Sequence, residues 1–125
     1  MRDAIGLDEQ VRAGFPFRAL ERFRRASGFS AGRIAEVVRI PPRTLARRRA
    51  GGKLRPEESE RLLRVARVFE QTVELFDGDV NAARGWLMRA RKALGGQTPL
   101  GLAQTEIGAR AVEDLIGRLE HGVFT

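Results

Sequence analysis

The sequence has no cysteine and only one histidine, His121. The absence of cysteine excludes disulfide bridges, cysteine-ligated zinc, iron–sulfur clusters and thiol nucleophiles. A lone histidine argues against a multi-histidine metal site and against a Ser-His triad, so we expect no metal, no cofactor and no enzymatic activity. No apolar run approaches the ~18 residues that a membrane span needs, and the first residues lack the apolar core of a signal peptide. We therefore expect a soluble, cytoplasmic protein.

The charge is unevenly distributed along the 125 residues, whose net charge is +7. Residues 1–55 hold thirteen Arg and one Lys against five acidic residues, for a net +9, and residues 56–125 have a net −2. This asymmetry indicates two surfaces with different partners. The basic half favours contact with nucleic acid. The alternative is a solvated basic face, because a preference for arginine over lysine can reflect genome composition.

Glycine and proline divide the chain into short segments in which apolar residues recur at steps of three and four. No segment shows the sustained alternation of a β-strand, so we predict an all-α fold. The predicted helices cover residues 17–26, 31–40, 43–50, 56–78, 80–94, 99–103 and 106–121, after a loose arm over residues 1–16. Their predicted N-caps are Ser30, Asp79, Thr98 and Thr105. Trp86 is predicted to anchor the core, and Asp77–Asn81 to be a turn rather than a calcium loop.

Residues 30–51 have the layout of a helix-turn-helix, with a tight break at Ile40-Pro41-Pro42 and an arginine-rich second helix. Leu45, the lone large apolar residue of that helix, should face inward. Guanidinium groups pair with phosphates and can bind guanine with two hydrogen bonds. The predicted DNA-binding residues are therefore Arg33, Arg43, Thr44, Arg47 and Arg48. The alternative is a basic surface helix without base contacts.

The last helix ends near His121, which is placed to interact with its free carbonyl groups. The following segment, Gly122-Val123-Phe124-Thr125, contains two apolar residues. Phe124 either folds back into the core or inserts into a partner, and the residues alone leave both open. The apolar stripes of residues 57–76 and of the last helix exceed the needs of a small protein, so we also predict a homodimer.

An ordered set of motifs resembles the antitoxins of the Xre/MbcA/ParS type. The matching residues are Arg43-Thr44-Leu45-Ala46-Arg47-Arg48, Glu58-Ser59, Arg61-Leu62, Arg64, Phe76-Asp77-Gly78-Asp79, Ala83, Trp86-Leu87, Leu94-Gly95-Gly96, Thr98-Pro99-Leu100, Thr105, Gly108, Val112, Leu115 and Gly122-Val123. The resemblance covers about residues 15–125. Where the family often has Pro-Asn after the Trp-Leu pair, this chain has Ala90-Arg91, which should let the helix run on to Lys92.

The resemblance implies an N-terminal Xre-like helix-turn-helix bundle followed by a small helical toxin-binding domain. We expect an arm over residues 1–16, the helix-turn-helix domain over 17–55, a connecting helix over 56–78 and the toxin-binding domain over 79–125. The implied function is that of a type II antitoxin that blocks the active site of a RES-domain toxin, which consumes NAD or modifies a protein with it. The implied toxin-binding residues are His121, Gly122, Val123, Phe124 and Thr125. Autorepression through operator DNA is also implied, and the alternative is a stand-alone helix-turn-helix repressor.

Overall fold

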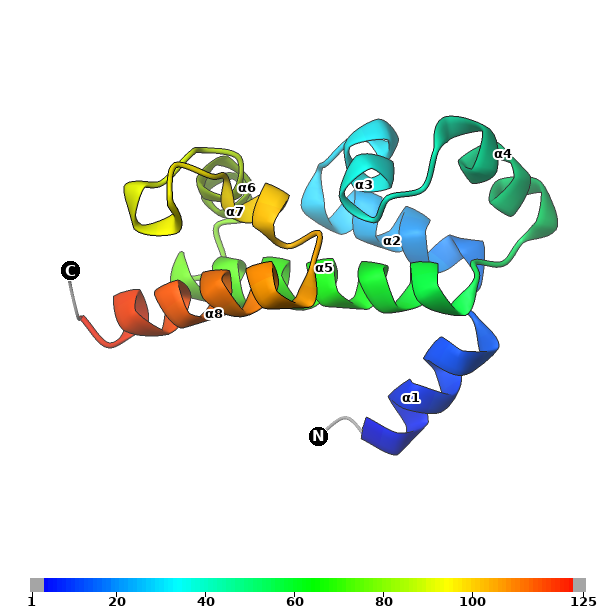
Figure 1. Cartoon of the computed structure of the whole chain (residues 1–125), viewed down its shortest axis with the longest axis horizontal. Coiled ribbons are helices and arrows are strands. Elements are labelled where there is room, and N and C mark those ends of the chain that lie inside the picture. The colour runs from blue at the N-terminus through cyan, green and yellow to red at the C-terminus, as the bar shows by residue number, and fades with distance from the viewer. Residues whose placement is uncertain (1–3, 123–125) are drawn as a thin grey trace.

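The structure, a computed structural model, describes residues 4–122 and is all-helical over that range (Figure 1). In chain order the elements are α1 (Ala4–Ala13), α2 (Phe17–Ser27), α3 (Ala31–Val37), α4 (Pro42–Gly51), α5 (Pro56–Leu75), α6 (Val80–Leu87), the 3₁₀ turn η1 (Lys92–Leu94), α7 (Pro99–Leu102) and α8 (Glu106–Glu120). No strand forms within residues 4–122, where the only β-type pairings are the isolated bridges Pro16–Lys53 and Arg91–Gln97. The predicted all-α fold class is confirmed.

Helix α5 is the long central element on which the other helices pack. Pro56 occupies its first turn together with Glu57 and Glu58, whose charges complement the positive end of the helix dipole. Its 20 residues extend for about 30 Å. The helix runs beneath both halves of the molecule (Figure 1) and contacts α1, α2, α6 and α8. Through α5, the two halves share one support.

The hydrophobic core is continuous across the two halves. Phe23 of α2 and Phe29 lie against Phe69 of α5, with ring centroids 5.6 Å apart for Phe23–Phe69 and 6.1 Å for Phe29–Phe69. Both pairs have the edge-on geometry that aromatic rings favour. Trp86 of α6 belongs to the same cluster and is buried, as predicted. One cluster of buried side chains therefore holds α2, α5 and α6 together.

The four predicted N-caps are confirmed. Each side-chain oxygen accepts a hydrogen bond from a backbone N–H in the first turn of its helix, which otherwise lacks a partner. The donor–acceptor distances are 3.1 Å at Ser30, 3.0 Å at Asp79, 3.0 Å at Thr98 and 3.0 Å at Thr105. Residues 77–81 accordingly form the predicted turn and cap.

The prediction of a loose arm over residues 1–16 is wrong where the structure describes it. Residues 4–13 form α1, which packs against α5 with Leu7 and Val11 half-buried. The helix ends at Gly14, whose φ is +87° and whose missing side chain allows the Leu54 carbonyl oxygen to approach. Leu7 and Val11 are four residues apart, as on one face of a helix, but two apolar residues are too short a pattern to predict that this helix packs on α5.

The predicted continuous helix over residues 80–94 is also wrong. Helix α6 ends at Leu87, and the chain passes through a loop that contains exposed Ala90 into η1. Arg91 is extended, its N–H donates to the Gln97 carbonyl oxygen at 3.0 Å, and its Nη2 donates to the Trp86 carbonyl oxygen at 3.1 Å. The side chain of Arg91 thus satisfies a carbonyl at the end of α6 and replaces the next helical turn.

Candidate nucleic-acid and protein interfaces

The turn between α3 and α4 has a defined geometry that sets the direction of α4. Arg39 has a φ of +58°, a conformation that favours glycine. The N–H of Arg39 donates to the Glu36 carbonyl oxygen, and the N–H of Ile40 donates to that of Ala35 at 2.8 Å. These bonds form a Schellman motif, which ends α3 sharply. Pro42 then begins α4 without losing a hydrogen bond, because the first N–H groups of a helix have no partner in it.

The outer face of α4 presents two of the predicted DNA-binding arginines. Arg43 and Arg47 are exposed, and Arg47 Nη2 lies 3.4 Å from the hydroxyl oxygen of half-buried Thr44. Leu45 is half-buried against the core, as predicted for the inner face. Arg33 lies on α3, where it is exposed and pairs with Glu36 at 3.4 Å. Arg43 and Arg47 are therefore available to a nucleic acid from one helix face.

Arg48 does not project outward, which corrects the sequence-based orientation. Its Nε donates to Glu58 Oε1 at 2.9 Å, so the side chain ties α4 to the first turn of α5. The same carboxylate oxygen accepts from the Arg55 N–H at 2.9 Å. Burial by itself raises the pKa of Glu58, but the hydrogen bonds from Arg48 and Arg55 outweigh it, so this pKa lies below its usual value. Arg48 holds α4 in place rather than lying with Arg43 and Arg47.

The C-terminal end of α8 is the start of the predicted toxin-binding segment. His121 caps α8, is exposed, and its Nδ1 lies 2.8 Å from the Gly117 carbonyl oxygen, to which it donates as the Nδ1–H tautomer. Gly122 is exposed and has a φ of +72°. The remaining predicted residues, Val123, Phe124 and Thr125, lie outside the described residues. The described part of the segment therefore begins at an exposed helix end.

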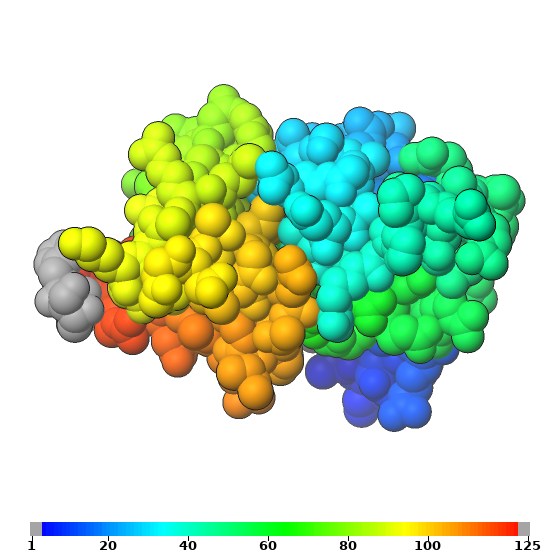
Figure 2. Space-filling view, turned by 45° about the horizontal axis from the view of Figure 1, so that its top comes forward, coloured from blue at the N-terminus to red at the C-terminus, as the bar shows by residue number. Residues whose placement is uncertain are grey.

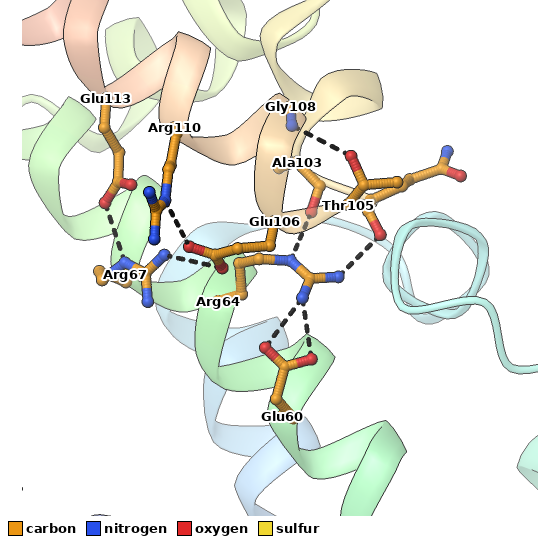
Figure 3. A network of polar contacts seen from close by, with 10 residues as sticks. Glu60, Arg64, Arg67, Ala103, Thr105, Glu106, Gly108, Arg110 and Glu113 are labelled. Carbon is orange, nitrogen blue, oxygen red and sulfur yellow. Dashed lines mark hydrogen bonds and ion pairs between the residues drawn. The ribbon is translucent and has the colours of Figure 1, made fainter.

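A buried arginine holds the turn between α7 and α8 against α5 (Figure 3). Arg64 Nε donates to the Ala103 carbonyl oxygen at 3.1 Å, and Nη2 donates to that of Gln104 at 2.7 Å. Arg64 Nη1 donates to both carboxylate oxygens of Glu60 at 2.8 Å. The residue is 4% exposed, so these bonds offset the removal of its charge from water. Arg64 lies four residues before Val68 and therefore on the buried face of α5. This spacing is the sequence signal from which the burial of Arg64 could have been predicted.

A second arginine connects the middle of α5 to α8 nearer the surface (Figure 3). Arg67 Nε donates to Glu113 at 2.9 Å, and its guanidinium pairs with Glu106 at 3.6 Å. Glu106 in turn pairs with Arg110 at 3.3 Å on the next turn of α8. Together with Arg64, this network fixes the orientation of α8, and with it the direction in which the C-terminal segment leaves the fold.

Comparisons with known proteins agree with this division of the surfaces. Residues 6–67 match the family model of the antitoxin Xre-like helix-turn-helix domain, and residues 71–122 match that of the antitoxin Xre/MbcA/ParS C-terminal toxin-binding domain. The protein named antitoxin Xre from Yersinia enterocolitica is 41% identical over 120 residues, which cover 95% of this chain and 81% of the relative. Antitoxin Xre from Photorhabdus laumondii is 37% identical over 120 residues, which again cover 95% of this chain and 81% of the relative.

This chain belongs to the Xre antitoxin family. The more distant antitoxin Xre of Pseudomonas putida is 31% identical over 66% of this chain and 52% of its own length. The helix-turn-helix model begins within α1, so most of this helix of the Xre-family chain lies in the part that matches the model. Helices α6, α7 and α8 all lie within the match to the toxin-binding domain.

Two further features of this Xre-family chain, within the described residues, are the grouping of its metal-ligating side chains and the apolar length of its helices. Residues 4–122 contain no cluster of three or more potential metal ligands among histidine, cysteine, aspartate and glutamate. None of the helices in that range is both long enough and apolar enough to span a bilayer.

Proposed function

We propose that this chain is the antitoxin of a RES-domain toxin and inhibits it by occupying its active-site cleft with residues 121–125. The observation that carries the proposal is the match of residues 71–122 to a toxin-binding domain whose last helix ends exposed at His121. A cleft can be blocked by a partner with a few buried anchors, and aromatic side chains are the common ones. Phe124 is the aromatic residue of this segment. Inhibition then requires neither a cofactor nor catalysis by this chain.

Deleting residues 122–125 tests the role of the segment. Helix α8 should persist, because the bond from His121 N to the Gly117 carbonyl oxygen is retained and the only described backbone bond that is lost is that of Gly122 N to the Leu119 carbonyl oxygen. We expect an unchanged circular dichroism spectrum and failed neutralisation of the co-expressed toxin, measured as growth arrest. Phe124→Ala should give a partial effect. Normal growth of cells that express the toxin with the truncated chain would contradict the proposed mechanism.

The chemistry of the toxin is tested separately. We expect the purified RES-domain protein encoded beside this chain's gene to consume NAD, either by hydrolysis or by transfer of ADP-ribose to a protein. Adding the full-length chain should stop this consumption, and the two proteins should co-purify. A helix-turn-helix repressor without a toxin is the alternative function, and it predicts neither result.

We also propose that α4 binds operator DNA and represses the operon of the pair. Arg43 and Arg47 are exposed on the same helix, whereas Arg48 is bound to Glu58. Arg43→Ala or Arg47→Ala should weaken operator binding by about 1–3 kcal/mol if the side chain contacts a base. If it contacts only phosphate, the slope of log K against log salt should fall by about one. Arg48→Ala should instead lower stability. Unchanged DNA binding in both outer variants would contradict a role for this face.

The predicted homodimer and cytoplasmic location belong to the same proposal. Within residues 4–122, α5 and α8 bury their apolar stripes against each other, and the large apolar side chains that remain exposed are Ile5, Met88 and Ile107. A dimer would therefore have to use a surface other than these two stripes. The molar mass from light scattering, measured with and without the toxin, gives the stoichiometry directly.

A further inference from the structure

The loop between α6 and α7, residues 88–98, differs in charge from the half of the chain to which it belongs. It contains Arg89, Arg91 and Lys92 and no carboxylate, although residues 56–125 have a net charge of −2. Elsewhere in residues 56–122, five arginine side chains donate hydrogen bonds to protein oxygens, whereas Arg118 has a buried Nε without a hydrogen-bond partner in the described chain. The partnered residues are Arg61 with the Val38 carbonyl, Arg64 with Glu60, Arg67 with Glu113, Arg84 with Asn81 and Arg110 with Glu106. The loop therefore concentrates positive charge that the fold does not use for ion pairing.

The cations of this loop lack carboxylate partners within the described chain. No Asp or Glu among residues 4–122 forms an ion pair with Arg89, Arg91 or Lys92, and the side chains of Arg89 and Lys92 are exposed. Burial and the neighbouring charge of Arg89 lower the pKa of Arg91. Among residues 4–122 no carboxylate pairs with these like charges, so they can pair with a negative group of a partner.

The backbone of the loop is held in one shape by hydrogen bonds, by the Arg91 side chain and by buried Leu94. The Arg91 guanidinium lies 4.9 Å from the centre of the Trp86 ring, over its face, in a cation–π contact. The carbonyl oxygen of Arg91 accepts from Gly96 N at 2.8 Å, and its N–H donates to Gln97. Leu94 is buried in the core and anchors η1. A pre-ordered loop loses little conformational entropy when it binds a partner.

The position of the loop relates it to the toxin-binding end rather than to α4. Helix α4 lies at the opposite end of the molecule from η1 in Figure 1, and the same separation is visible in Figure 2. The turn η1 contacts α8, and the loop lies beside the C-terminal end of that helix. The loop also lies inside the match to the toxin-binding domain. A partner that receives the segment after His121 would therefore meet this loop as well.

We propose that the α6–α7 loop is a second contact with the toxin, in which Arg89 and Lys92 bind an acidic protein surface beside the blocked cleft. The inference rests on the proposed function, because it assigns the charge of the partner at that interface. The toxin should present aspartate or glutamate side chains next to its active-site entrance. Exposed charge pairs of this kind mainly accelerate association and select the partner.

The test compares charge reversal in the loop with charge reversal on α4. Arg89→Glu/Lys92→Glu and the matched control Arg43→Glu/Arg47→Glu lower the net charge equally, and all four side chains are exposed. Binding to the purified RES-domain protein encoded beside this gene is measured by surface plasmon resonance. At about 0.05 M salt we expect the loop variant to associate at least ~10-fold more slowly, and the difference to shrink at about 0.5 M salt. The neutral variant Arg89→Gln/Lys92→Gln should give an intermediate rate.

The control variant should bind the toxin like the unaltered chain but lose affinity for promoter DNA, and the loop variant should do the reverse. Circular dichroism and the unfolding midpoint establish that each variant is folded. Equal association rates and salt dependences for the loop variant and the unaltered chain overturn the loop contact and leave the antitoxin function standing. Equal slowing by the two reversals, or loss of DNA binding in the loop variant, also overturns it. An unaltered chain that captures no RES-domain protein overturns both proposals.

Discussion

At the scale of single residues, one glycine decides how closely α7 and α8 can approach. A side chain at Gly108 would overlap the backbone carbonyl of Leu102. The N–H of Gly108 also donates a hydrogen bond to the capping oxygen Thr105 Oγ1 at 3.0 Å. Nothing lies within 4 Å of a side chain built at Gly117, two turns and a half further along the same helix. The two glycines of α8 are therefore opposite cases.

Gly108→Ala should lower the free energy of unfolding by about 3 kcal/mol, because the backbone of α7 must move to admit the new methyl group. Gly117→Ala should raise it by about 0.5–1 kcal/mol, because alanine is the better helix former and the space is open. Urea unfolding followed by circular dichroism measures both. If Gly108→Ala is as stable as Gly117→Ala, then the close approach of the two helices does not exist.

At the scale of elements, α4 is attached to α5 by Glu58. This carboxylate is 5% exposed and accepts from Arg48 and from the Arg55 N–H. Because the pKa of Glu58 is lower in the folded state, its negative charge stabilises the fold at pH values above its ordinary pKa of 4.5. This stabilisation is lost as the pH falls through the folded-state pKa. The attachment of α4 should therefore weaken in acid below about pH 4.5.

Glu58→Gln should lower the free energy of unfolding at pH 7 by about 1–3 kcal/mol, because a buried charged hydrogen bond becomes a neutral one. It should also reduce the loss of stability between about pH 5 and pH 3. The neighbouring Glu57 is the control, since its carboxylate is exposed and forms only a surface pair with Arg55. Glu57→Gln should change stability by less than about 0.5 kcal/mol. Equal pH profiles for the two variants would contradict the role of Glu58.

At the scale of the whole molecule, the continuous core implies that the two halves unfold together. Phe23 in the N-terminal half packs on Phe69 of α5, and Arg84 Nη1 of α6 donates to the Ser27 carbonyl oxygen at 2.8 Å. Trp86, the only tryptophan, lies in the C-terminal half. Its fluorescence therefore reports on one half while a substitution is made in the other.

Phe23→Ala should destabilise the protein by about 3–5 kcal/mol, because it leaves a cavity among the aromatic rings. The Trp86 fluorescence and the circular dichroism signal should shift to the same lower denaturant midpoint. The exposed Arg25→Ala on the same helix is the control and should leave the midpoint nearly unchanged. Separate transitions for the two signals in Phe23→Ala would show that the halves are independent units.

The sequence was sufficient to predict helix caps and the helices with clear apolar periodicity, but it missed α1 and the end of α6. The all-α class, the caps at Ser30, Asp79, Thr98 and Thr105 and the start of α5 at Pro56 follow from local hydrogen bonding and from helical periodicity. The exposed Arg43 and Arg47 followed from the pattern of α4. The toxin-binding role of the segment after His121 stays a prediction, and so do the positions of the domain boundaries.

The tertiary structure alone decided the features whose partners are distant in the sequence. Arg48 is removed from the outer face of α4 by Glu58, and Arg64 is buried because it satisfies carbonyl groups 39 and 40 residues away. The end of α6 is a different case, because Arg91 folds back on nearby Trp86 and pairs with nearby Gln97, and helical periodicity did not reveal these contacts. An arginine reads the same in the sequence whether its charge faces water or a buried acceptor. The fold alone places an acceptor beside one arginine and not beside another, and it thereby determines which of these charges can bind a partner.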